Sequence, residues 1–331
     1  MTQWETASAS VAGRRPANED AVLILPLGDR GLFLAVADGM GGITGGKVAS
    51  SIVLESAKEF LTARFAAPVH PSQLKKILRE LCERADDALR SEQKARPHLT
   101  RMGTTLTCVL SFGGKFVVAN IGDSRVFRLS SSGFERLTVD HTYIQDMVIR
   151  TGLKPDPALL RQFGHVLTRS IQGNNDKPDI FPVKERWFTL EEGDGFLLCS
   201  DGLILDKVAD REAALEQIAR ENPALPESAE AMISAVLAAG SSDNISVVLA
   251  RWRSSEEAAA PPADAGLPLR EAHDSDNPAG PSAARAPKVR RMVVLAIVLF
   301  VCAAAAVIFG VHACAGPAND GVPTAHAWSD K

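Results

Sequence analysis

Five aspartates stand at the ends of predicted strands, and together they suggest metal chemistry rather than turn formation. They are Asp20, Asp38, Asp123, Asp201 and Asp243. A single aspartate beside a strand usually starts a turn or caps a helix. Five carboxylates at one edge of a sheet would repel one another unless they bound cations, and such oxygen ligands favour magnesium or manganese over zinc. A pair of these ions could bridge a water, lower the pKa of that water and hold a phosphoryl oxygen.

The glycine-rich stretch GGITGGKV, residues 41–48, suggests a second kind of phosphate chemistry. It partly matches the phosphate-binding loop GxxxxGK[ST], because Gly41, Gly46 and Lys47 fit the pattern. Val48, however, stands where a hydroxyl residue would hold magnesium, and no suitable strand follows to supply a second ligand. We therefore disfavour a nucleotide hydrolase and interpret these glycines as a tight turn between a strand and a helix.

The aspartates need a scaffold, and the apolar pattern predicts one within residues 1–253. Strands are expected at Val22–Leu27, Leu32–Ala37, Thr104–Leu110, Lys115–Ala119, Arg125–Leu129, Val183–Thr189, Phe196–Cys199 and Ile245–Trp252. Helices are expected at 44–64, 72–95, 206–221 and 227–239. The polar residues 141–176 predict a flap with a short helix at 142–150. Strands in hairpins and helices in pairs predict an α+β fold in layers.

The composition of the chain argues against several classes of function and of site. The chain has 331 residues, of which 46% are hydrophobic and 23% are charged, as in a folded globular protein. Its net charge of -4 argues against nucleic acid as a partner, since nucleic-acid binders are usually basic. The five cysteines lie far apart without a CxxC pair, which argues against a zinc site or a disulfide framework.

The C-terminal part predicts a membrane anchor. Residues 254–291 are rich in Ala, Pro and Ser, which predicts a flexible linker, and they end in a cluster of Lys288, Arg290 and Arg291. Residues 292–314 are apolar throughout and long enough to cross the membrane as one helix, followed by a short tail at 315–331. The basic cluster places the catalytic domain in the cytoplasm, with residues 288–314 in contact with lipid. We expect a single-pass protein of the inner (cytoplasmic) membrane.

A series of short motifs between about residues 5 and 252 resembles the type 2C metal-dependent protein phosphatases of bacteria. In order they are Arg15-x-x-Asn18-Glu19-Asp20, Ala37-Asp38-Gly39-Met40-Gly41-Gly42, Gly103-Thr104-Thr105, Gly122-Asp123-Ser124-Arg125, Leu137-Thr138-Val139-Asp140-His141, Val166-Leu167-Thr168-Arg169, Ser200-Asp201-Gly202 and Asp243-Asn244. The resemblance implies an αββα four-layer sandwich, in which two stacked, mainly antiparallel sheets are flanked by helix pairs and the metals lie at one end. This architecture agrees with the layers predicted from hydropathy.

The same resemblance implies a set of metal ligands. Asp38 would bridge two Mn²⁺ or Mg²⁺ ions, with the carbonyl of Gly39 on the first ion. Asp243 would bind the first ion and Asp201 the second. Asp123, together with Asp201, would hold a third and weaker ion.

Four further residues complete the implied site. Asp20 would belong to the metal site by orienting metal-bound water, and Glu19 and Asn244 would support the ligands. Arg15 would bind the substrate phosphate, for which the planar fork of a guanidinium is well suited. The implied catalytic pair is therefore Arg15 and Asp38.

The implied reaction is hydrolysis of phosphoserine and phosphothreonine on proteins by in-line attack of a metal-bridging water. The expected partners are a cognate Ser/Thr kinase and the phosphorylated targets of that kinase. A binding module without activity is the alternative, but such a protein should have lost at least one of Asp38, Asp201 and Asp243, and all three are present.

Several positions depart from the family pattern. Met40 stands where animal relatives carry a histidine that donates a proton, and a methionine cannot do so. His141 is a possible substitute, but its motif leads into the flap, which disfavours that role. Lys47 occupies a position that is usually Glu, and residues 161–165 replace a usual His-Pro pair of the flap. Substrate specificity is therefore the property that the resemblance transfers least.

Overall fold

The computed structural model describes residues 4–42, 45–204 and 211–253. The chain divides into two units, residues 1–264 and 265–331, and the fold below belongs to the first unit. The predicted linker at 254–291, the membrane segment at 292–314 and the tail at 315–331 lie outside the described residues. Within the described part of the chain, no helix is both long enough and apolar enough to span a membrane.

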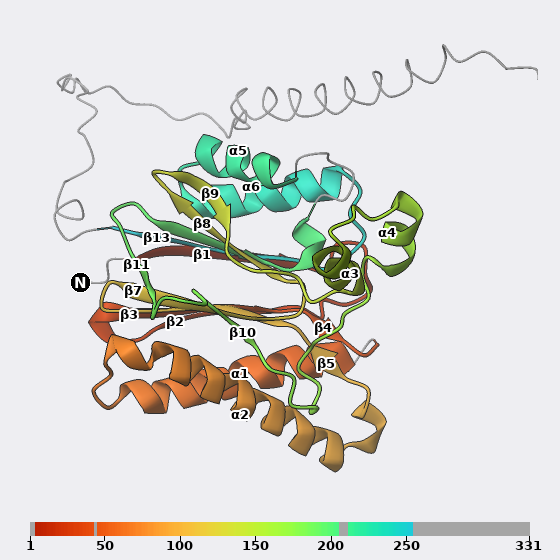
Figure 1. The fold of residues 1–331 in the computed structure, drawn as a ribbon, viewed down its shortest axis with the longest axis horizontal. Coiled ribbons are helices and arrows are strands. Elements are labelled where there is room, and N and C mark those ends of the chain that lie inside the picture. The colour runs from red at the N-terminus through yellow and green to blue at the C-terminus, as the bar shows by residue number, and fades with distance from the viewer. Residues whose placement is uncertain (1–3, 43–44, 205–210, 254–331) are drawn as a thin grey trace, which may run out of the picture. The chain divides into compact units, whose positions relative to one another are not determined.

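Two antiparallel sheets stack on each other at the centre of this unit (Figure 1). The first sheet has the order β1 (Trp4–Val11), β13 (Ile245–Trp252), β12 (Gly195–Cys199), β8 (Arg125–Ser130) and β9 (Gly133–Arg136). The second has the order β10 (Asp179–Phe181), β7 (Lys115–Ile121), β6 (Leu106–Phe112), β3 (Gly31–Ala37) and β2 (Ala21–Pro26), with β11 (Phe188–Thr189) also paired to β7. The short strands β4 (Gly39–Met40) and β5 (Gly103–Thr104) form a separate pair.

The central strand β3 shows why its sequence is apolar without interruption. All its residues are buried, because successive side chains point to opposite faces and both faces are covered. Phe33 and Ala35 belong to the core under the helices, whereas Leu34 and Val36 belong to the core between the sheets. That inner core is closed across the sheets by aromatic packing, since the ring centroids of Phe116 and Phe196 lie 4.8 Å apart.

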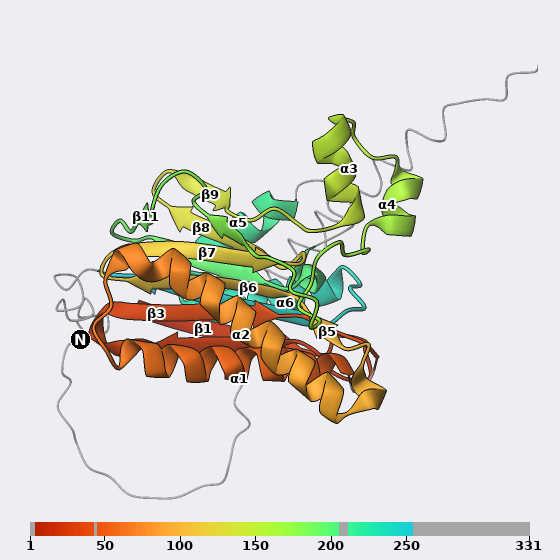
Figure 2. The ribbon, with the colours of Figure 1, turned by 60° about the horizontal axis from the view of Figure 1, so that its bottom comes forward.

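Helix pairs cover both outer faces, as Figures 1 and 2 show. The pair α1 (Gly45–Phe65) and α2 (Leu74–Ala95) covers the second sheet, and α5 (Arg211–Glu221) and α6 (Leu225–Ala238) cover the first. In α2, apolar residues at intervals of three and four are buried, at Leu74, Ile77, Leu78, Leu81, Ala85 and Leu89. Burial of each leucine contributes roughly 1.5–3 kcal/mol. The predicted α+β sandwich is thus confirmed for this unit.

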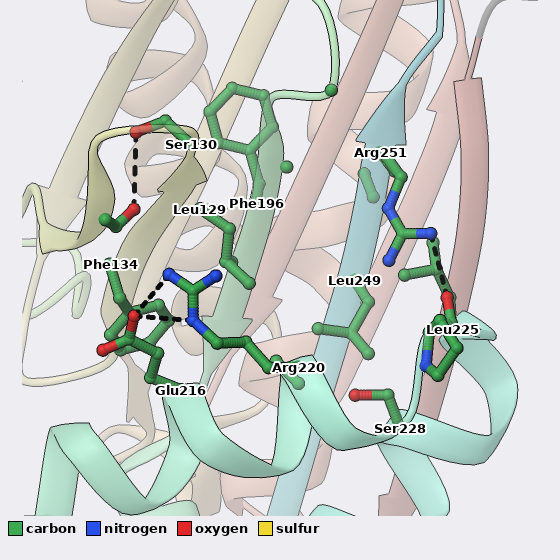
Figure 3. A pocket seen from close by; sticks show the side chains of 16 residues that line it. Leu129, Ser130, Phe134, Phe196, Glu216, Arg220, Leu225, Ser228, Leu249 and Arg251 are labelled. Carbon is green, nitrogen blue, oxygen red and sulfur yellow. Dashed lines mark hydrogen bonds and ion pairs between the residues drawn. The ribbon is translucent and has the colours of Figure 1, made fainter. Parts of the chain in front are cut away.

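A pocket of about 390 Å³ remains where α5 and α6 meet one end of the first sheet (Figure 3). Apolar side chains such as Leu129, Phe134 and Leu249 line it, beside the ion pair between Arg220 and Glu216. The hydroxyl of Ser228 on α6 also faces this pocket and is buried, with no hydrogen-bond partner among the described residues.

The segment between β9 and β10 is the predicted flap, and it holds two helices rather than one. The helix α3 (Tyr143–Thr151) begins after Thr142, whose hydroxyl accepts from the N–H of Gln145 at 3.2 Å, and ends at the left-handed Gly152. The second helix, α4 (Pro157–Phe163), was not predicted. In both views these helices stand at the same end of the sandwich as β5 (Figures 1 and 2).

One predicted strand was misplaced. The expected strand at Val183–Thr189 is paired only at its end, in β11, and the preceding pairing with β7 occurs at β10. Pro182 follows β10 and has no N–H to donate, so the ladder is interrupted there and resumes at Phe188. The strands β1 and β9 were also missed, and β1 pairs with β13 along its whole length.

Candidate metal centre

Asp38 lies between β3 and β4, and its backbone is fixed by a neighbouring pair of threonines. The N–H of Asp38 donates to the hydroxyl of Thr105 at 2.9 Å. The carbonyl of Asp38 accepts from the hydroxyl of Thr104 at 2.8 Å and from the N–H of Thr105 at 2.9 Å. The main chain at Asp38 is therefore held on both sides, which leaves its carboxylate to face the depression described below.

Asp201 and Asp243 are brought to one edge by the antiparallel pairing of β12 and β13. Cys199 lies opposite Val247, so the chain that leaves β12 and the chain that enters β13 are neighbours. A Cβ atom on Gly202 would lie 1.9 Å from the carbonyl oxygen of Asn244. Only glycine permits this approach of the two turns that carry the aspartates.

Asn244 ties the N-terminal loop to the same edge. Its amide nitrogen donates to the carbonyls of Ala12 at 3.0 Å and Ala17 at 2.9 Å. Its amide oxygen accepts from the N–H of Glu19 at 2.8 Å. All three bonds hold the loop that carries Arg15, so Asn244 positions that arginine.

Arg15 reaches the edge from this loop and pairs with a predicted metal ligand. Its guanidinium donates to Oδ2 of Asp243 at 3.0 Å, and both side chains are substantially exposed. An exposed ion pair of this kind contributes at most about 1 kcal/mol. The guanidinium can therefore leave Asp243 at little cost and bind another anion.

Asp20 lies buried behind these residues. Its Oδ2 accepts hydrogen bonds from the hydroxyls of Ser200 at 2.8 Å and Ser246 at 2.7 Å. Its other oxygen, and Oε1 of Glu19, are buried without a hydrogen-bond partner among the described residues. Burial raises the pKa of Asp20 and of Glu19. Unpartnered buried carboxylate oxygens are costly in a folded protein, and a bound cation or water would satisfy them.

The other predicted residues converge on one depression of about 500 Å³ at this end of the sandwich. Those that line it are Arg15, Glu19, Asp38, Gly39, Asp123, Asp201, Asp243 and Asn244. Asp20 is the one predicted site residue that does not line it. Its charge nevertheless acts on Asp38.

The electrostatics of the depression favour a cation. Burial raises the pKa of Asp38 well above its usual range, and four neighbouring carboxylates raise it further. The pKa of Asp123 is raised well above its usual range by burial, and by the charges of Asp201 and Asp140. Among the described residues, no group of three or more aspartate, glutamate, histidine or cysteine side chains is arranged so that it could hold a metal ion by itself. The donors are nevertheless all hard oxygens around a strongly negative space, which fits Mg²⁺ or Mn²⁺.

Sequence reasoning missed part of the lining. The flap contributes His165, Leu167, Ser170 and Gln172 to the depression, and Thr105 contributes from the sheet side. His165 was visible as a flap histidine, but the path of an irregular segment cannot be read from spacing. His141 is almost fully buried and is not part of the lining.

Comparison with known proteins now identifies the family. The model described as Protein phosphatase 2C matches residues 10–249. The chain belongs to the protein phosphatase 2C family. The matched residues include every residue that lines the depression.

Individual relatives of this phosphatase domain are bacterial. The serine/threonine protein phosphatase PstP of Mycobacterium tuberculosis is 34% identical over 236 residues, which cover 71% of this chain and 42% of PstP. The serine/threonine phosphatase stp of Listeria monocytogenes is 32% identical over 70% of this chain and 89% of the relative. The crystal structure of the PstP catalytic domain with two manganese ions aligns with 76% of this chain and 99% of that chain, at 31% identity and a TM-score of 0.64.

Proposed function

We propose that the protein is a metal-dependent phosphatase that hydrolyses phosphoserine and phosphothreonine on proteins. The observation that carries this proposal is the convergence of Asp38, Asp123, Asp201 and Asp243 on one depression, with Arg15 at its edge. The chain spans less than half of PstP, so its activity is inferred from its own residues together with family membership.

Two core Mn²⁺ or Mg²⁺ ions are the proposed cofactor, as in the manganese-bound PstP domain. Asp38 would hold both ions, with the Gly39 carbonyl and Asp243 on the first and Asp201 on the second. Asp123, together with Asp201, would hold a third, weaker ion. When bound, the ions lower the pKa of water and neutralise charge on the phosphoryl oxygens.

The protein's own side chains supply binding and orientation. Arg15 leaves its exposed pair with Asp243 and donates two hydrogen bonds to the phosphate of the substrate. Oδ1 of Asp20 and Oε1 of Glu19 are buried without a partner among the described residues, so each could accept a hydrogen bond from a water that reaches it. Asn244 keeps Arg15 and Asp243 on the same edge through its bonds to the N-terminal loop.

Selectivity among phosphoamino acids tests the proposal. The full chain, supplied with manganese, should release phosphate from matched phosphothreonine and phosphoserine peptides much faster than from a phosphotyrosine peptide. Removal of metal with EDTA should stop release, and manganese should restore it. A folded protein that releases no phosphate with manganese, or releases it equally well in EDTA, would refute the proposal.

We also propose that residues 292–314 anchor the protein in the inner membrane, with the phosphatase domain in the cytoplasm. The support is the uninterrupted apolar run and the basic cluster at Lys288, Arg290 and Arg291 that precedes it. Such an anchor would raise the effective concentration of the phosphatase near a membrane-bound Ser/Thr kinase and its targets. A kinase deletion that leaves the phosphoproteins controlled by this phosphatase unchanged would refute the kinase part.

A further inference from the structure

The turn that carries Asp123 is clamped through the peptide groups of its neighbour Gly122. The N–H of Gly122 donates to Nδ1 of His141 at 3.1 Å. The carbonyl of Gly122 accepts from the backbone N–H of His141 at 2.9 Å and from the amide of Asn120 at 3.1 Å. Gly122 has φ +110°, and a Cβ there would lie 2.5 Å from Cγ2 of Thr105, so the turn requires glycine.

These contacts fix the tautomer of His141. A peptide N–H can only donate, so Nδ1 of His141 accepts the bond from Gly122. The ring hydrogen must then lie on Nε2, which donates to Oδ2 of Asp179 at 3.1 Å. Burial lowers the pKa of His141, which agrees with a neutral ring.

The residue before His141 holds the other side of the same turn. Asp140 accepts from Nε of Arg125 at 3.2 Å and from its terminal nitrogen at 2.8 Å. Arg125 lies two residues after Asp123, and Gly122 lies one residue before Asp123. The adjacent residues Asp140 and His141 therefore bracket Asp123 from both sides.

The same histidine connects this turn to the end of the flap. Asp179, the first residue of β10, also accepts two hydrogen bonds from the guanidinium of Arg169, at 2.8 and 3.2 Å. The N–H of Thr168 donates to the carbonyl of His141 at 2.9 Å. A continuous path of hydrogen bonds thus runs from Arg169 through Asp179 and His141 to Gly122.

We propose that His141 is a positioning residue, which holds the Asp123 turn in place and couples it to the exit of the flap. It does not touch the depression itself, and it acts through Gly122. The inference rests on the proposed function, because it assigns to His141 control over the third, weaker ion that Asp123 and Asp201 would hold.

Two substitutions in the full-length protein each remove one of the two hydrogen bonds of the His141 ring and keep the other. The amide oxygen in His141→Asn can replace Nδ1 and accept from Gly122, but it cannot reach Asp179. The amide nitrogen in His141→Gln can replace Nε2 and donate to Asp179, but the bond to Gly122 is lost. Calorimetric titration with Mn²⁺ and amide hydrogen exchange in the metal-free protein are the two measurements.

The proposal predicts different results for the two variants. His141→Gln should weaken the third Mn²⁺ at least tenfold, leave the two core ions within about threefold, and speed exchange of the Gly122 amide. His141→Asn should keep the third ion within about threefold of wild type and instead speed exchange around Asp179. Asp179→Leu, which is similar in size but cannot accept a hydrogen bond, should resemble His141→Asn, and it replaces that variant if the substituted histidine prevents folding.

Three results would overturn this inference, and they differ in what else they affect. Equal third-ion affinity in wild type and His141→Gln would refute the role of His141 alone. A wild type that binds two core ions and no third would refute the inference together with the proposed role of Asp123, and leave the core site intact. A wild type that binds no manganese at all would refute the proposed function itself.

Discussion

Two buried serines illustrate, at the residue scale, how much depends on a single hydrogen-bond partner. The hydroxyl of Ser246 donates to Asp20 and also shares a bond with Ser10, whereas that of Ser228 has no partner among the described residues. Ser246→Ala should lower the free energy of unfolding by about 1–3 kcal/mol, because a buried carboxylate oxygen loses a donor. Ser228→Ala should be neutral or stabilising, within about 1 kcal/mol.

Urea unfolding in EDTA measures both serine variants under the same conditions. Each substitution removes one hydroxyl from a side chain that is almost fully buried, so each serves as the control for the other. Equal losses in the two variants would contradict this account of Asp20.

Arg15 gives a second prediction at this scale. Arg15→Lys keeps the positive charge but loses the two-pronged donor, so the KM for a phosphothreonine peptide should rise about tenfold while kcat changes less. Arg14→Lys is the matched control, because Arg14 is the adjacent exposed arginine and does not line the depression. Identical kinetics in Arg15→Lys and wild type would show that Arg15 does not bind the phosphate.

At the scale of elements, the strand ends bring together carboxyl groups with raised pKa values. These groups affect how the stability of the protein depends on pH. Burial raises the pKa of Asp20, Asp38 and Asp123 in the fold, whereas the unfolded chain has ordinary values of about 3.9. Between these values the folded protein binds more protons than the unfolded chain, so its stability falls as the pH rises. The lowered pKa of His141 opposes this trend below its ordinary value of about 6.5, but it belongs to a single group.

The metal-free protein should therefore have a higher Tm near pH 5 than near pH 8, and manganese should raise the Tm most at pH 8. Thermal unfolding in EDTA and in excess manganese measures both effects. A metal-free protein whose stability rises steadily from pH 5 to pH 8 would contradict the crowding of carboxylates described here.

The elements also show how far sequence alone could reach. β3 was predicted within one residue because it is buried on both faces and reads as one apolar run. β1 was missed because its small and polar residues, WETASASV, carry a weak strand signal although they pair fully with β13. The second flap helix was missed because α4 buries none of its residues and therefore shows no apolar face.

The same contrast holds within the site. The aspartates were predicted because each stands at a strand end, where antiparallel pairing gathers such residues. The loop attachment made by Asn244 and the clamp made by His141 were not predicted, since both bridge segments that are far apart in sequence. Such contacts depend on the path of loops, which local spacing does not determine.

At the scale of the whole molecule, we predict that the anchor determines where the protein is located and has little effect on its activity. Deletion of residues 292–314 should move the protein from the membrane fraction to the soluble fraction. Phosphate release from a soluble phosphothreonine peptide should stay within about twofold, because the depression is built entirely from residues 15–244. A deletion variant that still sediments with the membrane would contradict the anchor.

The most direct test of the central claim is the rate of phosphate release from a phosphothreonine peptide as the manganese concentration is raised. Wild type and the control Asp29→Asn, which alters an exposed aspartate outside the depression, should show the same saturable activation. Asp38→Asn should lose at least a hundredfold in rate at every manganese concentration while keeping its fold. Activation of Asp38→Asn equal to that of wild type would contradict the claim that these carboxylates form the metal centre of a phosphatase.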